Sequence, residues 1–130
     1  MSIELVADTL LRAHAPLVAV VGQRIALQEP AEGTQAPYVV YQIVSDVAVQ
    51  YTGELPTTWI ARIQVNPVAQ TINQLISIRA LVAAALESNT QRTVAGTRVL
   101  VCRREFRGPL LKDEFTGLWT RSEDFSLTYE

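Results

Sequence analysis

Few side chains in this sequence are suited to chemistry, and they do not form a recognisable set. The one histidine, His14, lies beside Pro16 at an expected helix end, without a nucleophile or an orienting carboxylate near it in sequence. The one cysteine, Cys102, lies in an alternating apolar segment, where a cysteine is usually a small buried apolar side chain, although Arg103 and Arg104 could lower its pKa. We expect a partly exposed His14, a buried Cys102, and a catalytic role for neither.

The acidic residues also fail to form a catalytic pair. Asp113 and Glu114 are neighbours, as are Glu123 and Asp124, but adjacent side chains of a strand point to opposite faces. The sequence contains no glycine-rich phosphate loop, no His and Cys residues at metal-ligand spacing and no Gly-x-Ser-x-Gly motif. We therefore expect no enzyme activity, no cofactor and no metal site.

Basic residues are concentrated in the last third of the chain. Residues 1–91 contain four Arg and seven acidic residues, a net charge of −3, whereas residues 92–130 contain seven Arg or Lys and six acidic residues, a net charge of +1. Four of these cations lie close together in sequence: Arg103, Arg104, Arg107 and Lys112. They are either a salt-sensitive docking patch for an acidic partner or for passing DNA, or a solvated strand end neutralised by nearby acids, and both interpretations remain open.

Arg79 is unusual because it falls inside the apolar arc of a predicted helix. On a helical wheel of 100° per residue it lies among Leu75, Ile76, Val82 and Ala83. Its guanidinium either extends to the helix edge or pairs with a carboxylate, which could belong to a neighbouring subunit. We favour the first interpretation.

Length and composition bound the class of protein. The chain has 130 residues, of which 48% are hydrophobic and 18% charged, which predicts one domain over residues 1–130 and excludes a disordered chain. A formal net charge of −2 argues against permanent wrapping of nucleic acid. The longest apolar stretch, residues 16–21, is too short to cross a bilayer, and the first residues lack the basic start of a secretory signal. We expect a soluble protein, made inside the cell, with no membrane partner.

Periodicity predicts alternating helices and strands. In the first half we expect a helix over residues 2–14, a short turn over 17–21 ended by Gly22, a brief strand over 24–27 and a long loop over 28–37. Two longer strands follow, one over 38–45 with its exit over 46–56, and one over 59–66 ended by Pro67. In the second half we expect a helix over 71–86, a strand over 92–104 with a turn at Ala95-Gly96, a second long loop over 105–117 and a last strand over 118–130. This order predicts the α+β class, with one mostly antiparallel four- to five-stranded sheet and two helices packed on one face.

Three segments carry a resemblance to a known family. They are Pro37-Tyr38-Val39-Val40-Tyr41-Gln42-Ile43-Val44-Ser45 after an acidic loop, Arg62-Ile63-Gln64-Val65-Asn66 before the helix over 71–86, and the terminal Arg121-Ser122-Glu123-Asp124-Phe125-Ser126-Leu127-Thr128-Tyr129. In this order and spacing the chain resembles the tail-completion proteins of tailed bacteriophages, also called tail terminator or tail-to-head joining proteins. Where that family often has Asp-Val-Tyr-Ala, this chain has Asn66-Pro67-Val68-Ala69.

The resemblance implies a structural protein of the virion. Such proteins form a ring, commonly a hexamer, on the end of the tail tube, which stops tube growth and joins the tail to the head connector or stopper protein while DNA passes through. The protein would be assembled in the host bacterial cytoplasm and lie in the neck region of the virion tail. Its expected partners are further copies of itself, the tail tube protein and the connector.

In such a ring the two long loops, over 28–37 and 105–117, are expected to contact other subunits, the tube or the connector. The candidate interface residues are Glu29, Glu32, Arg79, Arg103, Arg104, Arg107, Lys112 and Asp113. Three alternatives remain: a small α+β protein-binding module, a subunit of the tail tube itself, and an enzyme that uses His14, Cys102 and an acidic residue.

Overall fold

The first two helices follow one another without a loop. In the computed structural model, which describes residues 2–49, 53, 55 and 57–130, helix α1 (Ile3–Ala13) begins where the Ser2 hydroxyl accepts a hydrogen bond from the Leu5 N–H at 3.3 Å. Helix α2 (Ala15–Val21) begins directly after His14, with Pro16 in its first turn. The predicted short turn over 17–21 is therefore wrong: proline needs no N–H partner in a first helical turn, so Pro16 begins a helix. Gly22, at φ 60°, ends α2 as predicted.

The predicted helix over 71–86 is confirmed as helix α3 (Ile72–Leu86). Its N-terminus is capped by the Thr71 hydroxyl, which accepts a hydrogen bond from the Gln74 N–H at 3.1 Å. The Gln74 side chain in turn accepts from the Gln70 N–H at 3.0 Å. The face of α3 that carries Leu75 and Ile78 is buried against the sheet.

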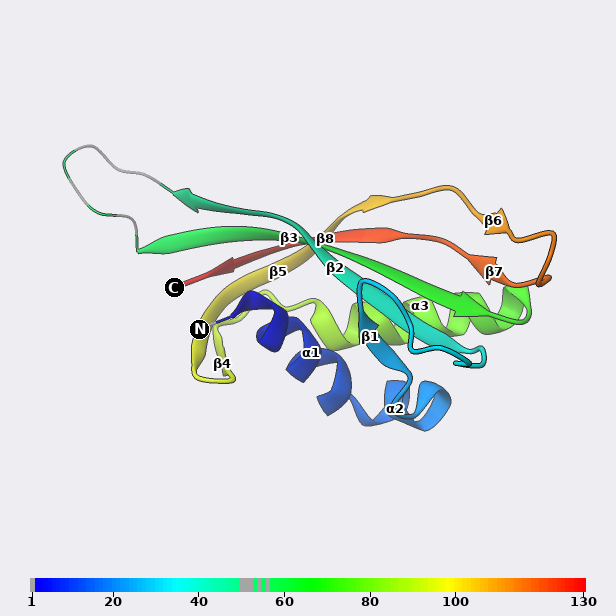
Figure 1. Cartoon of the computed structure of the whole chain (residues 1–130). Helices are drawn as coiled ribbons and strands as arrows, with labels where there is room; N and C mark the ends of the chain where they lie inside the picture. Colours follow the sequence, from blue (N-terminus) through cyan, green and yellow to red (C-terminus); the bar gives the residue numbers. More distant parts are fainter. Residues whose placement is uncertain (1, 50–52, 54, 56) are drawn as a thin grey trace.

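The eight described strands form one mixed, strongly curled sheet (Figure 1). Their bounds are β1 (Ile25–Leu27), β2 (Tyr38–Val49), β3 (Thr58–Ala69), β4 (Arg92–Val94), β5 (Thr97–Arg107), β6 (Leu111–Lys112), β7 (Trp119–Thr120) and β8 (Glu123–Tyr129). Strand β1 is parallel to β2, and every other pair is antiparallel. The order is β1-β2-β3-β8-β5-β4, with β7 paired to both β3 and β6.

The α+β class is confirmed, but the predicted size of the sheet is wrong. The described residues form three helices and eight strands, where two helices and four to five strands were expected. The predicted strand over 92–104 is a hairpin of β4 and β5, because Ala95 and Gly96 both adopt positive φ, which suits a two-residue turn. The predicted loop over 105–117 contains the end of β5 and all of β6, and the predicted strand over 118–130 is divided into β7 and β8. Of the predicted exit over 46–56, residues up to Val49 continue β2, and Pro56 lies outside the described residues.

The prediction that Pro67 ends the second long strand is also wrong, because β3 continues to Ala69. Pro67 lies between the stretch of β3 that pairs with β8, which ends at Val65, and the stretch that pairs with β7, which begins at Val68. The Pro67 carbonyl accepts a hydrogen bond from the Thr120 hydroxyl at 2.9 Å, so the Pro67 nitrogen also points to the side of β3 where β7 and β8 lie. Neither β7 nor β8 has a residue paired with Pro67 on that side. The proline therefore removes no ladder hydrogen bond there.

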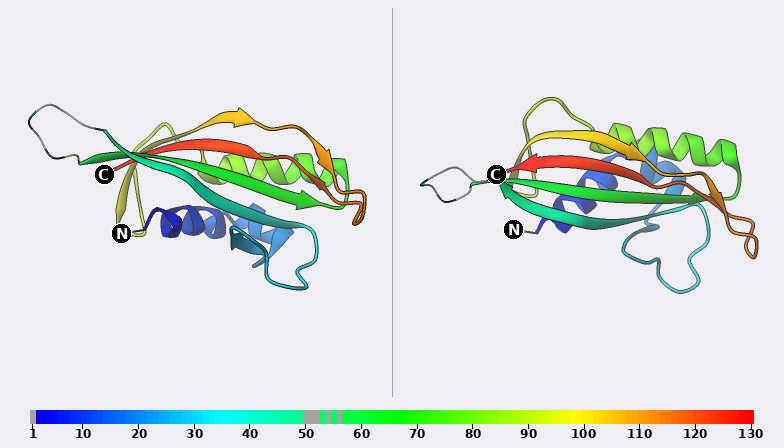
Figure 2. Two further views of the ribbon diagram at one scale, coloured as in Figure 1. Left: turned by 45° about the horizontal axis from the view of Figure 1, so that its top comes forward. Right: turned by 90° about the horizontal axis from the view of Figure 1, so that it is seen from above.

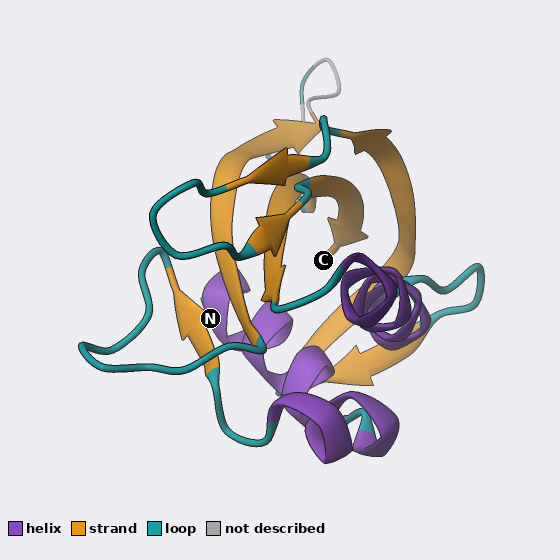
Figure 3. Ribbon diagram, turned by 90° about the vertical axis from the view of Figure 1, so that its right-hand side faces the viewer, coloured by secondary structure: helices purple, strands orange, loops and turns teal. Residues whose placement is uncertain are grey.

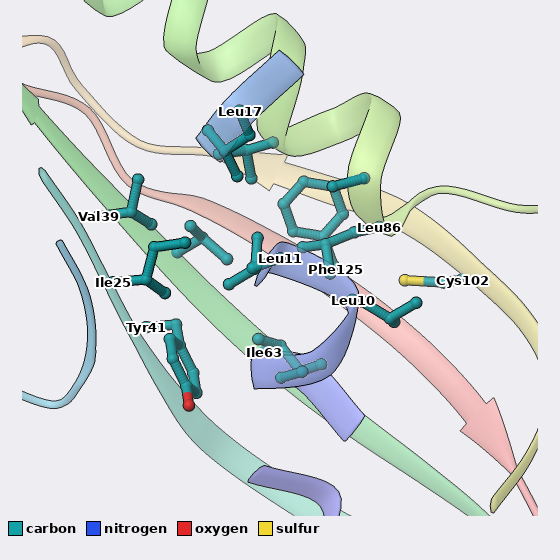
Figure 4. Packing of buried hydrophobic residues seen from close by; sticks show 14 of the residues in the cluster. Leu10, Leu11, Leu17, Ile25, Val39, Tyr41, Ile63, Leu86, Cys102 and Phe125 are labelled. Atoms are coloured by element: carbon teal, nitrogen blue, oxygen red, sulfur yellow. The ribbon is translucent and has the colours of Figure 1, made fainter. Parts of the chain in front are cut away.

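The core lies between the concave side of the sheet and the three helices. Figure 3 shows the strands curling around the helices, and Figure 4 shows Phe125 and Ile63 of the sheet directed toward Leu11, Leu17 and Leu86 of the helices. All five of these side chains are fully buried. The opposite side of the sheet carries no helix among the described residues (Figure 2).

The molecule is elongated, with a hairpin at each end. Figures 1 and 2 show the β2–β3 hairpin extending past the helices at one end, near both termini, and the β6–β7 hairpin at the other end. The helices do not cover the β2–β3 hairpin, whereas α3 contacts β7 at the other end.

Candidate interaction surface

Arg79 is held by an ion pair inside its own chain. Glu123 begins β8 on the face that meets α3, and only 2% of the residue is exposed. The Arg79 Nε–H donates to its Oε1 at 2.6 Å, and an Arg104 Nη1–H donates to its Oε2 at 3.3 Å. The prediction that Arg79 extends to the helix edge is therefore wrong: a buried carboxylate from a distant strand lies within reach of its guanidinium, and this pairing compensates both charges.

The predicted cluster of cations is divided between the two faces of β5. Arg104 points inward, opposite Phe125 of the core, and also lies 3.5 Å from the Glu87 carboxylate. Arg103 points to the opposite face, beside Ser126, and is exposed. Arg107, at the end of the strand, is exposed too. Within the described part of the chain, neither Arg103 nor Arg107 forms an ion pair, so these two charges are available to a partner.

Lys112 and Asp113 belong to the β6–β7 hairpin. The Lys112 ammonium lies 5.3 Å from the centre of the Trp119 ring, a cation–π distance. The Asp113 carboxylate accepts a hydrogen bond from the Phe115 N–H at 2.9 Å, and the Asp113 carbonyl accepts from the Gly117 N–H at 2.7 Å. Asp113 thus holds a turn that leaves the Phe115 side chain fully exposed.

Glu29 and Glu32 lie elsewhere. Both are exposed on the connection between β1 and β2, and the sheet order separates that connection from β5 by β2, β3 and β8. Arg103 and Arg107 therefore lie on β5, Lys112 lies on the β6–β7 hairpin, and the two glutamates lie apart from all three.

Sequence reasoning missed several exposed apolar side chains. On the β2–β3 hairpin, Val47 is 60% exposed and is paired with Ile60, which is 40% exposed. Phe106 on β5 and Leu110, Leu111 and Phe115 at or near the β6–β7 hairpin are also exposed. Alternation predicts that one face of a strand points outward, but it does not show which strands the helices leave uncovered.

Cys102 and His14 occupy the environments predicted for them. Cys102 is 1% exposed, and burial raises the pKa of its thiol to about 12, so the thiolate required of a nucleophile is scarce near neutral pH. His14 lies at the junction of α1 and α2 and is partly exposed. Across the described residues, no three His, Cys, Asp or Glu side chains come together in a way that could hold a metal ion.

None of the three described helices has both the length and the apolar character that a membrane span requires. The longest of them, α3, has 15 residues.

Sequence comparison identifies one matching family. The family model described as "Tail completion protein gp17" matches residues 9–115, which include the second half of α1, helices α2 and α3, and strands β1 to β6. No curated protein matches the sequence.

Two solved structures share the fold over nearly the whole chain. A chain of the structure described as "Virion of native gene transfer agent (GTA) particle" gives a TM-score of 0.76 at 14% identity and covers 99% of this chain and 95% of that chain. A chain of a second solved structure gives a TM-score of 0.65 at 15% identity and covers 100% of this chain and 96% of that chain. At these identities the likeness shows the fold alone.

Proposed function

Because this chain belongs to the tail completion protein gp17 family, we propose that it is a structural protein of a phage tail, which forms a ring at the end of the tail tube, ends tube growth and joins the tail to the head connector. DNA passes through the ring. The observation that carries this proposal is the family match over residues 9–115, and the fold shared with a chain of a gene transfer agent virion supports it.

The size of the subunit supports a ring. A folded chain of 130 residues has a radius of gyration of about 14 Å, so a single copy cannot encircle a DNA duplex. Several copies in head-to-tail contact can do so if their rotation closes. The resemblance to tail terminators favours a hexamer.

The exposed ends of the sheet are the surfaces that such a ring needs. The ring has to contact three kinds of partner: its own copies, the last tier of the tube and the connector or stopper protein. Arg103, Arg107 and Lys112, and separately Glu29 and Glu32, are exposed charged residues that could serve these contacts. Arg79 and Arg104 instead serve the subunit itself, since both bind Glu123.

A role without catalysis agrees with the local chemistry. The one thiol is buried and protonated near neutral pH, and the buried carboxylates Glu123 and Asp124 are each bound by an arginine. We propose that the protein acts in the neck of the virion tail, through its shape and its contacts.

Electron microscopy of particles made without this protein tests the proposal. A phage or prophage genome with the gene deleted is induced, and the lysate is compared by negative staining with one in which a plasmid supplies the wild-type chain. We expect tails of uncontrolled length, or free tails beside free heads, only in the deletion lysate. A complete absence of tails would favour a tube subunit instead, and normal infectious particles would refute the proposal.

A further inference from the structure

We propose that neighbouring copies of this chain join edge to edge, with the free edge of β2 from one copy pairing with the free edge of β5 from the next. This inference rests on the proposed ring and names the surfaces that build it. It follows from the backbone pairing at the two edges of the sheet and from the charges that those edges carry.

Strand β2 has a long free edge. Strand β1 pairs only with residues 39–41 of β2, so residues 42–49 have a strand partner only on the β3 side within the described part of the chain. The Val44 and Val47 side chains on this stretch are 52% and 60% exposed, and Asp46 is its one charged residue. Proteins usually protect such an edge with lysine, proline or a covering segment, so this stretch is suited to pairing with another chain.

Strand β5 has a free stretch on the opposite edge of the sheet. Strand β4 pairs only with residues 97–99 of β5, and Cys102 makes an isolated bridge with Ser88. Beyond it, residues 103–107 pair with β8 alone among the described strands. Five residues of strand span about 17 Å, which is enough for a short intermolecular ladder. Phe106, 53% exposed, lies on this stretch and offers an apolar contact to Val47.

The charges favour pairing between the two different edges. The β2 edge carries Asp46, and the β5 edge carries the exposed Arg103 and Arg107 with one exposed acid, Glu105. Two β2 edges would bring two aspartates together, and two β5 edges would bring the arginines together, and like charges opposite one another destabilise a sheet. A β2 edge against a β5 edge instead sets Asp46 near Arg103 and Arg107.

The positions of the two edges make this contact propagate. In the sheet order, β3 and β8 lie between β2 and β5, so the two free stretches lie on opposite edges of the sheet (Figure 1). Each copy therefore offers one edge to the copy before it and the other to the copy after it. Such a heterologous contact builds a closed ring when its rotation closes.

Charge reversal with mixed subunits tests the pairing. One variant carries Asp46→Arg, and the other carries Arg103→Glu with Arg107→Glu. Each is supplied from a plasmid to a genome that lacks the gene, alone and together, and infectious particles are counted. We expect each variant alone to lower the titre at least about tenfold. Both together should restore it, because each reversed edge then meets a complementary one.

A matched control separates charge from local structure. The Tyr129 hydroxyl donates to the Asp46 carboxylate at 2.7 Å, and Asp46→Arg removes this bond as well as the charge. Tyr129→Phe removes the bond and keeps the charge, so it should leave the titre at the wild-type level. Thermal unfolding of each purified variant confirms that it folds.

The outcomes separate this inference from the proposed function. The pairing of β2 with β5 is wrong if each variant alone gives a wild-type titre. It is also wrong if both variants fold and their co-expression gives a titre as low as either variant alone. In both cases the ring proposal stands. If the wild-type plasmid itself does not change the particles, the proposed function fails.

Discussion

Glu123 is the carboxylate that compensates the buried charge of Arg79. It accepts hydrogen bonds from Arg79 and Arg104, while Arg79 is largely buried, with 13% of its side chain exposed. Removing one member of a buried ion pair leaves the other charge uncompensated, which costs more than the pair itself contributes. Arg104, with 28% of its side chain exposed, retains contact with water and with Glu87.

We therefore expect Glu123→Gln to lower the free energy of unfolding by about 3 kcal/mol, because Arg79 would keep its charge without a counter-ion. The matched change Arg104→Met should cost about 1 kcal/mol, because Arg79 still binds Glu123. Urea unfolding of the two variants measures the difference. Equal costs would show that the network is not centred on Glu123.

Cys102 should make stability sensitive to alkaline pH. Burial raises the pKa of its thiol from 9.0 to about 12, so between these values the unfolded chain loses a proton that the folded chain keeps. This contribution is fully present below about pH 9 and is lost as pH rises toward about 12.

The comparison is between wild type and Cys102→Ala, unfolded by urea at several pH values between neutral and about 11. Tyr41, which is buried, and Tyr129, which is half-buried, also have pKa values raised by desolvation and by a hydrogen bond to an aspartate, so both proteins lose some stability at alkaline pH. We expect a shallower loss in the alanine variant. Identical slopes would show that Cys102 is not desolvated as described.

At the residue scale, the sequence predicts environments better than partners. The alternation around Cys102 predicts that it is buried, and the proline after His14 predicts a helix end. The same reasoning places Arg79 in an apolar arc and cannot supply its partner, because Glu123 lies 44 residues further along the chain. A contact of that separation depends on how the sheet is ordered.

At the scale of elements, strong local signals predict α3 and the starts of β2 and β3 correctly. Capping residues and period determine such segments without help from the rest of the fold. The extension of β2 past Ser45 depends on a bulge between Ile43 and Ser45, and the passage of β3 through Pro67 depends on a break between its neighbours. Both are properties of pairing, and no local pattern in the sequence shows them.

The free edge of β2 yields a prediction at this scale. Val39 and Tyr41 direct their backbone groups toward β1, since the Val39 N–H donates to Arg24 and the Tyr41 carbonyl accepts from Gln28. The N–H and C=O groups of successive residues point to opposite sides of a strand. The bulge between Ile43 and Ser45 shifts this alternation by one residue. The N–H of Ala48 therefore faces the free edge, and that of Val47 faces β3.

We expect Ala48→Pro to fold normally and to fail in particle assembly, because its missing N–H and its ring lie on the proposed contact. Val47→Pro should lower the free energy of unfolding by more than Ala48→Pro does, because it removes a ladder hydrogen bond with β3. Thermal unfolding and the plasmid complementation assay measure the two effects. A fully infectious Ala48→Pro phage would argue against pairing at this edge.

At the scale of the whole molecule, the sequence predicts the α+β class and the family, and misses the shape. The β2–β3 hairpin projects past the helices (Figure 2), and parts of β2 and β5 have a strand partner on only one side among the described residues. The exposed hairpin and the free strand edges are what an assembling subunit would use. The sequence does not show them, because they depend on how far the helices and the neighbouring strands extend along the sheet.

The copy number of this chain per particle tests the central claim most directly. Purified particles are digested, and the chain is quantified by mass spectrometry against the tail tube protein and the connector. A protein that closes the tube should be present as one ring per particle, in the same amount whether tails are long or short. Copies that increase in proportion to the tube protein, or a chain that is missing from finished particles, would contradict the account.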